Sequence, residues 1–381
     1  MKKILLFAAL FLCFAGTQSF AQTQANDAEK KLNFYGDART RLEHDWDVIT
    51  SAGDTLDPRL RFRSRFRLGF TYDYNKNLSF GGRIRAGSAT DQQSPHLTWG
   101  NEFATLPIGL DRAFIKYTCK GLTAWTGKNT FPFYYQDELF WDEDVSPEGL
   151  YASYEIKNEI GTLKVKPAAG MFFISSAGKP FDKDRTLLAG QIHLNHKSEK
   201  TELNLATGIF NMDSLGNLPD GVETFSVDYN LSVSNVRFTY NTAKLPITIG
   251  ANVMMNLADL TDSTIVANAH DGETMGYDVI LEIGKLKAAK DYLISFTYAH
   301  IEKYSIVDYF AQDDWLRWGF SGATGTRSSN FQGFEIRLAY AFGPKCNIML
   351  RTYIVEGIAE NTPGATLETN NRFRLDMNIG F

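Results

Sequence analysis

Arginines at alternate positions are the most distinctive chemical feature of this sequence. Arg59, Arg61, Arg63, Arg65 and Arg67 are each separated by a single residue. Successive side chains of a β-strand point to opposite faces, so a strand here would carry five guanidinium groups on one face. Such a face concentrates anions or orients polar solutes. The alternative is a wet interior that tolerates charges without using them. Four later residues are expected to extend the same basic wall: Arg83, Arg85, Arg112 and Lys116.

A second cluster, in residues 130–147, combines carboxylates with six aromatic side chains. The carboxylates are Asp137, Glu138, Asp142, Glu143 and Asp144. A freely solvated loop has little use for so many rings, whereas a loop folded into the interior of a hollow fold can anchor them on its inner wall. If the strands predicted below enclose such an interior, this segment is expected to be a constriction loop whose acidic side faces the basic wall. The alternatives are an outer cap packed on neighbouring loops and a calcium site, because hard cations take several oxygen ligands.

Other reaction chemistries find little support in the sequence. The 381-residue chain has 39 basic and 44 acidic residues, and its net charge of -5 argues against nucleic-acid binding. His193 and His196 would point to opposite faces of a strand, which makes them a poor metal pair. There is no Gly-x-Ser-x-Gly nucleophile motif, and the glycine-rich segments lack a phosphate-loop pattern. We expect no enzyme activity, no cofactor and, apart from the calcium alternative, no metal.

The elements that position these side chains are β-strands, because apolar and polar residues alternate with a period of two along most of the chain. Strands are predicted at residues 32–43, 59–74, 77–88, 110–119, 121–129, 148–157, 161–175, 186–197, 201–212, 229–241, 245–257, 274–287, 291–303, 331–342, 346–358 and 371–381. The fold class is therefore all-β, a transmembrane antiparallel β-barrel of about sixteen strands. Fourteen or eighteen strands remain alternatives, because 121–129 and 229–241 have the weakest patterns. A barrel of this size encloses an aqueous lumen.

The connections between these strands alternate in length. Short connections lie near residues 75–76, 120, 158–160, 198–200, 242–244, 288–290 and 343–345. Long ones cover 44–58, 89–109, 130–147, 176–185, 213–228, 258–273, 304–330 and 359–370. Outer-membrane barrels have this asymmetry, with tight periplasmic turns and long extracellular loops, so both termini are expected to be periplasmic. A secreted β-sandwich or β-helix is the alternative, and it gives no reason for the alternation.

Both ends of the chain fit export to the cell outer membrane. Lys2 and Lys3 precede a short apolar run and a Ser19-Phe20-Ala21 cleavage site, so residues 1–21 are predicted to be a secretory signal peptide. The run is too short for a membrane-spanning helix. The mature barrel is then 22–381. Its last strand alternates and ends in Phe381, which resembles the signal that the barrel assembly machinery of outer membranes reads.

A family resemblance is carried by the segment from Arg61 to Gly149. Its motifs are Arg65-Phe-Arg-Leu-Gly69, Gly82-Arg-Ile-Arg-Ala-Gly-Ser88, Gln93-Ser-Pro95, Leu110-Asp-Arg-Ala-Phe-Ile115, Thr126-Gly-Lys-Asn129 with Pro132-Phe133, and Trp141-Asp-Glu-Asp-Val-Ser-Pro-Glu-Gly149. Together, and in this order, they resemble the "putative porin" family of Gram-negative bacteria. The later strands show the general barrel pattern only.

The resemblance implies a pore-forming barrel in outer-membrane lipid and names no solute. We expect a porin that allows passive diffusion of small hydrophilic solutes or ions through a charged aqueous lumen. One alternative is a channel specific for anionic solutes, phosphate-like or acidic saccharides, that uses the arginine row. The other is a non-conducting surface barrel with an adhesive or structural role. A homotrimer is one option for the assembly, which the sequence does not fix.

Overall fold

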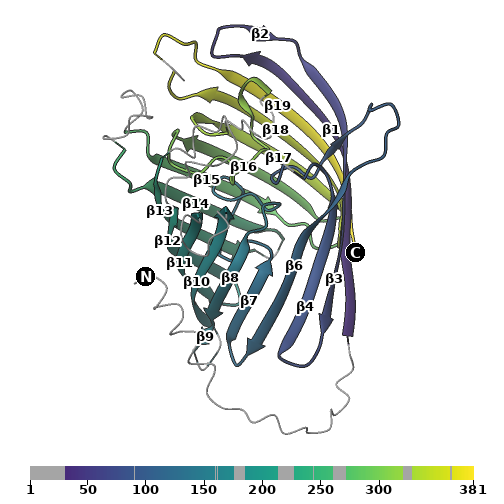
Figure 1. Ribbon diagram of the computed structural model, residues 1–381, viewed down its shortest axis with the longest axis vertical. Coiled ribbons are helices and arrows are strands. Elements are labelled where there is room, and N and C mark those ends of the chain that lie inside the picture. The colour runs from purple at the N-terminus through teal and green to yellow at the C-terminus, as the bar shows by residue number, and fades with distance from the viewer. Residues whose placement is uncertain are drawn as a thin grey trace.

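The computed structural model describes residues 31–89, 91–158, 160, 162–175, 185–212, 227–242, 244–260, 272–320, 328–360 and 363–381. The predicted signal peptide, 1–21, lies outside these residues. Among them, the only helix is the three-residue 3-10 turn η2 (Trp318–Phe320). No described helix is long and apolar enough to cross a membrane. The protein is all-β (Figure 1).

The strands follow one another in a single antiparallel sheet. They are β1 (Lys31–Ile49), β2 (Thr55–Leu56), β3 (Arg59–Asp73), β4 (Leu78–Ala86), β5 (Leu97–Thr98), β6 (Ile108–Cys119), β7 (Leu122–Lys128), β8 (Glu148–Tyr154), β9 (Ile156–Lys157), β10 (Leu163–Ser175), β11 (Arg185–Lys197), β12 (Thr201–Met212), β13 (Tyr229–Asn241), β14 (Pro246–Asn256), β15 (Met275–Gly284), β16 (Tyr292–Ile301), β17 (Phe331–Gly343), β18 (Cys346–Gly357) and β19 (Thr369–Gly380). Three of them, β2, β5 and β9, have two residues each. The other sixteen are the barrel staves.

The sheet closes where β1 pairs with β19, and each other stave pairs with its neighbours along the chain. Closure matters because an open edge in a hydrocarbon layer would leave backbone N–H and C=O groups without partners. All sixteen predicted strands are present, including the two with the weakest patterns. The prediction of about sixteen strands is confirmed.

The first strand is where the sequence prediction fails most. It was expected to end at residue 43, with a loop over 44–58, but β1 continues to Ile49. Its second half is held on both sides, because Asp45 lies opposite Arg59 on β3 and opposite Arg372 on β19. A polar run that looks like loop in the sequence is therefore strand, since two neighbouring strands supply the opposite charges.

The two faces of the sheet differ as the alternation predicts. On β3 the side chain of Phe62 is 52% exposed and points outward, whereas the next residue, Arg63, is 8% exposed and points into the barrel. Outward-facing apolar side chains recur on many other staves, for example Ile249, Phe296 and Leu338. The barrel thus has an apolar outer surface and a polar, charged interior.

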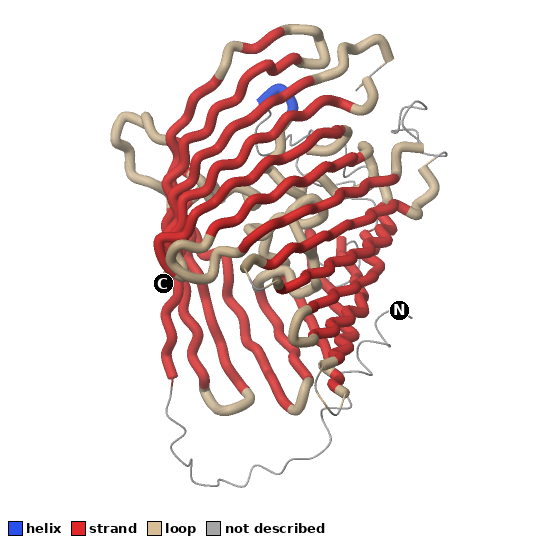
Figure 2. Tube along the Cα trace, turned by 180° about the vertical axis from the view of Figure 1, so that it is seen from behind, coloured by secondary structure: helices blue, strands red, loops and turns tan. Residues whose placement is uncertain are grey.

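Short and long connections lie at opposite ends of the barrel. Successive connections of an antiparallel sheet lie at alternate ends, so connections that alternate in length are sorted by end. The connections 74–77, 120–121 and 344–345 are short, whereas 87–107, 129–147 and 302–330 are long. The short connections lie at the end where β1 starts and β19 stops (Figure 1). Several long connections run back inside the ring of strands (Figure 2).

Candidate functional site

The predicted basic wall is largely paired with carboxylates. Its strand β3 lies beside β1, which carries acidic residues at alternate inward positions, and β4 lies beside β6. The ion pairs are Arg59–Asp45 (3.0 Å), Arg61–Glu43, Arg63–Glu43 (3.4 Å), Arg65–Asp37 (3.0 Å), Arg67–Asp37 (2.7 Å) and Arg83–Asp111. The arginine row is therefore not a surface of free positive charge.

Three members of the predicted wall differ from the rest. Arg85 donates hydrogen bonds to the backbone carbonyls of Asp91 (2.7 Å) and Gln92 (3.0 Å), and Arg112 donates to Ser146 Oγ (3.3 Å). Among the described residues, neither these two arginines nor Lys116 forms an ion pair with a carboxylate. The uncompensated positive charge of the wall therefore lies on β4 and β6 rather than on β3.

The segment 129–147, which connects β7 and β8, lies against the inner wall of the barrel, where it contacts β12 and β14. Its rings form an aromatic cluster: Phe131 stacks on Trp141 with ring centroids 4.2 Å apart, and Phe133 packs on Phe210 of β12 at 5.3 Å. The amide of Gln136 donates to the carbonyl of Ala251 on β14 at 2.9 Å. The alternative of an outer cap does not fit these contacts, because the partners belong to staves of the barrel.

The five carboxylates of this segment divide into two groups. Glu143 and Asp144 reach Arg65, at 3.3 Å and 3.4 Å. Burial alone would raise the pKa of Glu143, but Arg65 and Arg67 outweigh it and lower the pKa to about 2. The acidic side of the predicted loop thus meets the basic wall at these two residues.

The other three carboxylates of the segment lie away from the arginine row. Asp137 accepts a hydrogen bond from Asn252 Nδ2 at 2.7 Å, on the opposite side of the barrel. Burial, followed by repulsion from Asp314, raises the pKa of Glu138 to about 8. Burial, followed by repulsion from Glu138, also raises the pKa of Asp142. The raised pKa values of Glu138 and Asp142 are therefore set by burial and by neighbouring carboxylates rather than by the arginine row.

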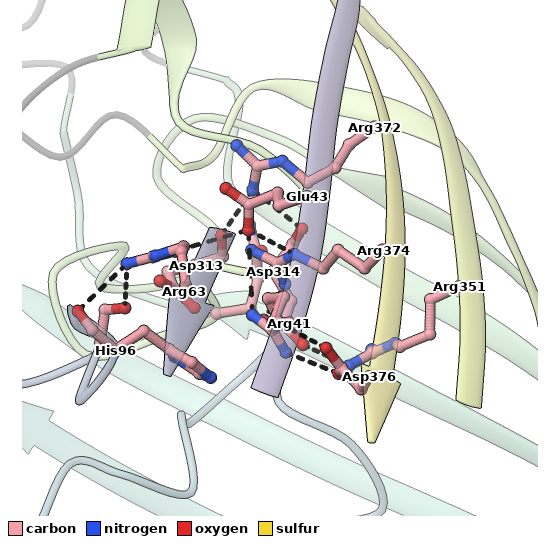
Figure 3. Close-up of polar contacts among 12 residues, drawn as sticks. Arg41, Glu43, Arg63, His96, Asp313, Asp314, Arg351, Arg372, Arg374 and Asp376 are labelled. Carbon is pink, nitrogen blue, oxygen red and sulfur yellow. Dashed lines mark hydrogen bonds and ion pairs between the residues drawn. The ribbon is translucent and has the colours of Figure 1, made fainter. Parts of the chain in front are cut away.

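A second long connection, the described part of 302–330, also folds into the barrel, and the sequence reasoning missed it. Asp314 forms ion pairs with Arg351 of β18 and Arg374 of β19, and lies 3.6 Å from Arg41 of β1 (Figure 3). The backbone N–H of Asp142 donates to the carbonyl of Phe310 at 2.8 Å, so the two inward segments are in contact. Its composition was a usable signal, because residues 307–318 mix carboxylates and rings as 130–147 do.

These residues belong to a buried network of alternating charge. Arg41 on β1 donates through Nε and Nη2 to both carboxylate oxygens of Asp376 on β19, at 2.7 Å and 2.9 Å. Arg374 donates to Glu43 at 2.8 Å (Figure 3). Each of these two guanidinium groups lies between a carboxylate of the neighbouring strand and Asp314 of the inward connection, a geometry that favours strong charge-assisted hydrogen bonds. The network fixes the inner wall of β1, β18 and β19.

A cavity of 290 Å³ remains between the inward segments and the wall. It is bounded by Arg39, Arg65, Gln93, His96, residues 135–139, residues 142–144, Ile280, Glu282, Ser295, Thr297, residues 313–315, Glu335, Arg337, Met349 and Arg351. Charged side chains of both signs face this space, so a polar solute is better accommodated there than an apolar one. In the described part of the chain, no three His, Cys, Asp or Glu side chains are grouped to hold a metal ion. The calcium alternative for the loop therefore finds no support.

Comparisons with known proteins agree with this architecture. Residues 16–265 match the "Putative porin" family. No curated protein matches the chain. OprB of Pseudomonas putida, in its high-pH structure, is 12% identical with a TM-score of 0.56, over 92% of this chain and 94% of that one. An anion-selective porin from Comamonas acidovorans is 11% identical with a TM-score of 0.54, over 93% and 100%. OmpF of Salmonella typhi, solved with daunomycin, is 12% identical with a TM-score of 0.52, over 94% and 99%. At such identities these likenesses establish the fold alone.

Proposed function

Because the chain belongs to the "Putative porin" family, we propose that it is an outer-membrane porin through which small hydrophilic solutes and ions diffuse passively. One observation carries this proposal: the closed barrel is apolar outside, and its interior keeps a charged cavity beside the inward segments. Passive diffusion needs a polar path across the membrane and no chemical step, so the proposal includes no enzyme activity and no cofactor. The cell outer membrane is the compartment in which such a barrel works.

We propose that the inward segment 129–147 constricts this path. Arg39 and Arg65 line the cavity together with Glu138 and Asp142. The two carboxyls would complete a transverse field that aligns polar solutes only when they are ionised, which for Glu138 means above a pH of about 8. The nine residues of the predicted basic wall line the lumen in this proposal. Only those without a carboxylate partner would contribute strongly to selectivity, because a paired arginine presents little net charge to a passing ion.

The proposal places both termini in the periplasm, with the short connections there and the long ones outside the cell. The C-terminal strand ending in Phe381 would be read by the barrel assembly machinery, and residues 1–21 would direct export. A homotrimer is the proposed assembly, since porin structures of this size commonly form trimers. Outer-membrane lipid would cover the apolar side chains of the staves.

The two rival functions predict different contacts. An anion-specific channel that uses the arginine row requires free guanidinium groups, but all five arginines of the row, and six of the nine residues of the basic wall, have carboxylate partners. A non-conducting barrel requires the inward segments to block every continuous path through the lumen. Conductance therefore distinguishes it from a porin.

Single-channel conductance in a planar bilayer tests the proposal. The mature chain is folded in detergent, its folded state is checked by heat-modifiable migration, and a salt gradient gives the reversal potential. Discrete, stable openings are expected. No openings from correctly folded protein would contradict the porin proposal and favour the non-conducting barrel.

A further inference from the structure

A second cavity lies at the short-connection end of the barrel, between the connection 120–121 and the start of the segment 129–147. Its volume is 730 Å³, within the range of sites that take small molecules. Its lining includes four lysines, Lys116, Lys120, Lys157 and Lys166, together with the rings of Trp125 and Tyr151. The lining residues come from strands β6 to β10, from the connections between them and from the first residues of the segment 129–147.

The charge of this cavity is unbalanced. Four lysines line it against one carboxylate, Glu155. That carboxylate is already engaged by Lys157 at 2.9 Å, with Lys164 also 3.9 Å away. Lys116, Lys120 and Lys166 form no ion pair with any described carboxylate. This contrasts with the β3 row, where each arginine has an acidic partner, so the cavity is a part of the described lumen in which positive charge is free to bind an anion.

The neutral lining adds a second requirement on the ligand. Hydroxyl groups come from Thr118, Thr123 and Ser153, which can donate to or accept from the hydroxyls of a ligand. Trp125 and Tyr151 are stacked with ring centroids 5.9 Å apart and form an apolar floor. Ammonium groups, hydroxyls and aromatic faces together suit a small anion that also carries hydroxyl groups and an apolar face.

We propose that this cavity is a binding site for a hydroxylated organic anion, an acidic monosaccharide or a sugar phosphate, with Lys116 and Lys166 as its charged contacts. The site lies on the path of the proposed porin, and in that respect the inference rests on the proposed function. Arg112 is on the same strand as Lys116 and likewise forms no ion pair with a described carboxylate, so positive charge continues from the site toward the constriction. The anion would therefore bind on one side of the constriction, next to the start of the segment 129–147.

Direct binding to the folded protein in detergent tests this without any transport step. Glucuronate and glucose 6-phosphate are titrated calorimetrically at low and high salt, with glucose and inorganic phosphate as comparison ligands. Both sugar anions are expected to bind, more weakly at high salt, whereas glucose is not. Equal affinity for inorganic phosphate and glucose 6-phosphate would overturn the role of the hydroxyl and aromatic lining. No binding by either sugar anion would overturn the site.

Variants locate the site within the barrel. Lys116→Gln and Lys166→Gln are each expected to weaken binding about tenfold, because each removes a charge-assisted hydrogen bond to the anion. Lys244→Gln is the matched control, since Lys244 is an exposed turn lysine at the same end of the barrel and outside the cavity. An equal loss in the control would show non-specific attraction and contradict the site. Conductance without binding would refute this inference alone, whereas binding without conductance would refute only the porin proposal.

Discussion

At the scale of single residues, the interior is governed by which charges have partners. Glu43 and Asp376 are fully buried between arginines, and a buried charge is tolerated only when it is paired in this way. Among the described residues Glu138 forms no ion pair, and burial outweighs the attraction of Arg351 and raises its pKa. Residues of one chemical type therefore differ in charge state according to their neighbours.

Glu138 should make ion selectivity depend on pH. Its pKa of about 8 means that it is neutral at pH 6 and ionised at pH 9, and it lines the cavity beside the constriction. The cation-to-anion permeability ratio, measured from reversal potentials, is expected to rise as pH increases through about 8. Glu138→Gln should abolish this rise.

A neighbouring residue on the same segment provides the control for this prediction. Glu143 has a pKa of about 2, so it is ionised at both pH values. Glu143→Gln should lower cation preference throughout and keep the rise, moved somewhat below pH 8 because repulsion from Glu143 contributes to the raised pKa of Glu138. If the rise persists in Glu138→Gln, another group titrates in the pore.

Replacing Asp314 by asparagine should destabilise the barrel. Asp314 is in contact with Arg41, Arg351 and Arg374, and removing one partner from a buried ion pair costs about 3–5 kcal/mol. A lower midpoint of heat-induced unfolding in detergent is the expected result. Glu148→Gln, which breaks an exposed pair with Lys128, should change stability by about 1 kcal/mol or less. Similar midpoints for the two variants would mean that Asp314 is not ionised in the folded barrel.

At the scale of elements, two inward segments rather than one shape the lumen. The sequence predicted the first, because rings and carboxylates together are hard to explain in a solvated loop. The second has a similar composition, but its inward course depends on Arg351 and Arg374, which lie on strands far along the chain. The carboxylate partners of the arginine row escaped prediction for the same reason, since Glu43 and Asp45 only meet it when β1 pairs with β3.

Deleting residues 134–144 should increase conductance. This removes the part of the segment that reaches β14 and contacts Arg65, so the lumen widens. The increase should be partial, because the segment that contains Asp314 stays in place. Deleting 52–54, the exposed tip of the connection between β1 and β3, is the control and should leave conductance unchanged. Unchanged conductance in both folded variants would place the segment outside the ion path.

At the scale of the whole molecule, the period-two alternation was sufficient to predict the barrel, because lipid and water on the two faces act on every strand alike. Connection lengths then predict orientation, which labelling can test. In a background with Cys119 and Cys346 replaced by serine, Asp54→Cys should react with a bulky membrane-impermeant maleimide on intact cells. Lys76→Cys, at the opposite end, should react only after the outer membrane is permeabilised. The reverse result would place the long connections in the periplasm.

The division between an apolar outside and a polar inside can be tested on two neighbouring residues of β16. Phe296 is 45% exposed on the outer face, whereas Thr297 is 6% exposed and lines the cavity. Phe296→Arg should lower the free energy of unfolding by about 2–4 kcal/mol if the position lies near the bilayer midplane, as measured by urea unfolding in phospholipid vesicles. Phe296→Ala separates this cost from the loss of ring packing on Phe334. Thr297→Arg should fold with much less destabilisation but change conductance, because its guanidinium enters the aqueous cavity. Equal destabilisation by the two arginines would mean that both faces of β16 are shielded from water, and the barrel would then have no aqueous lumen at this height.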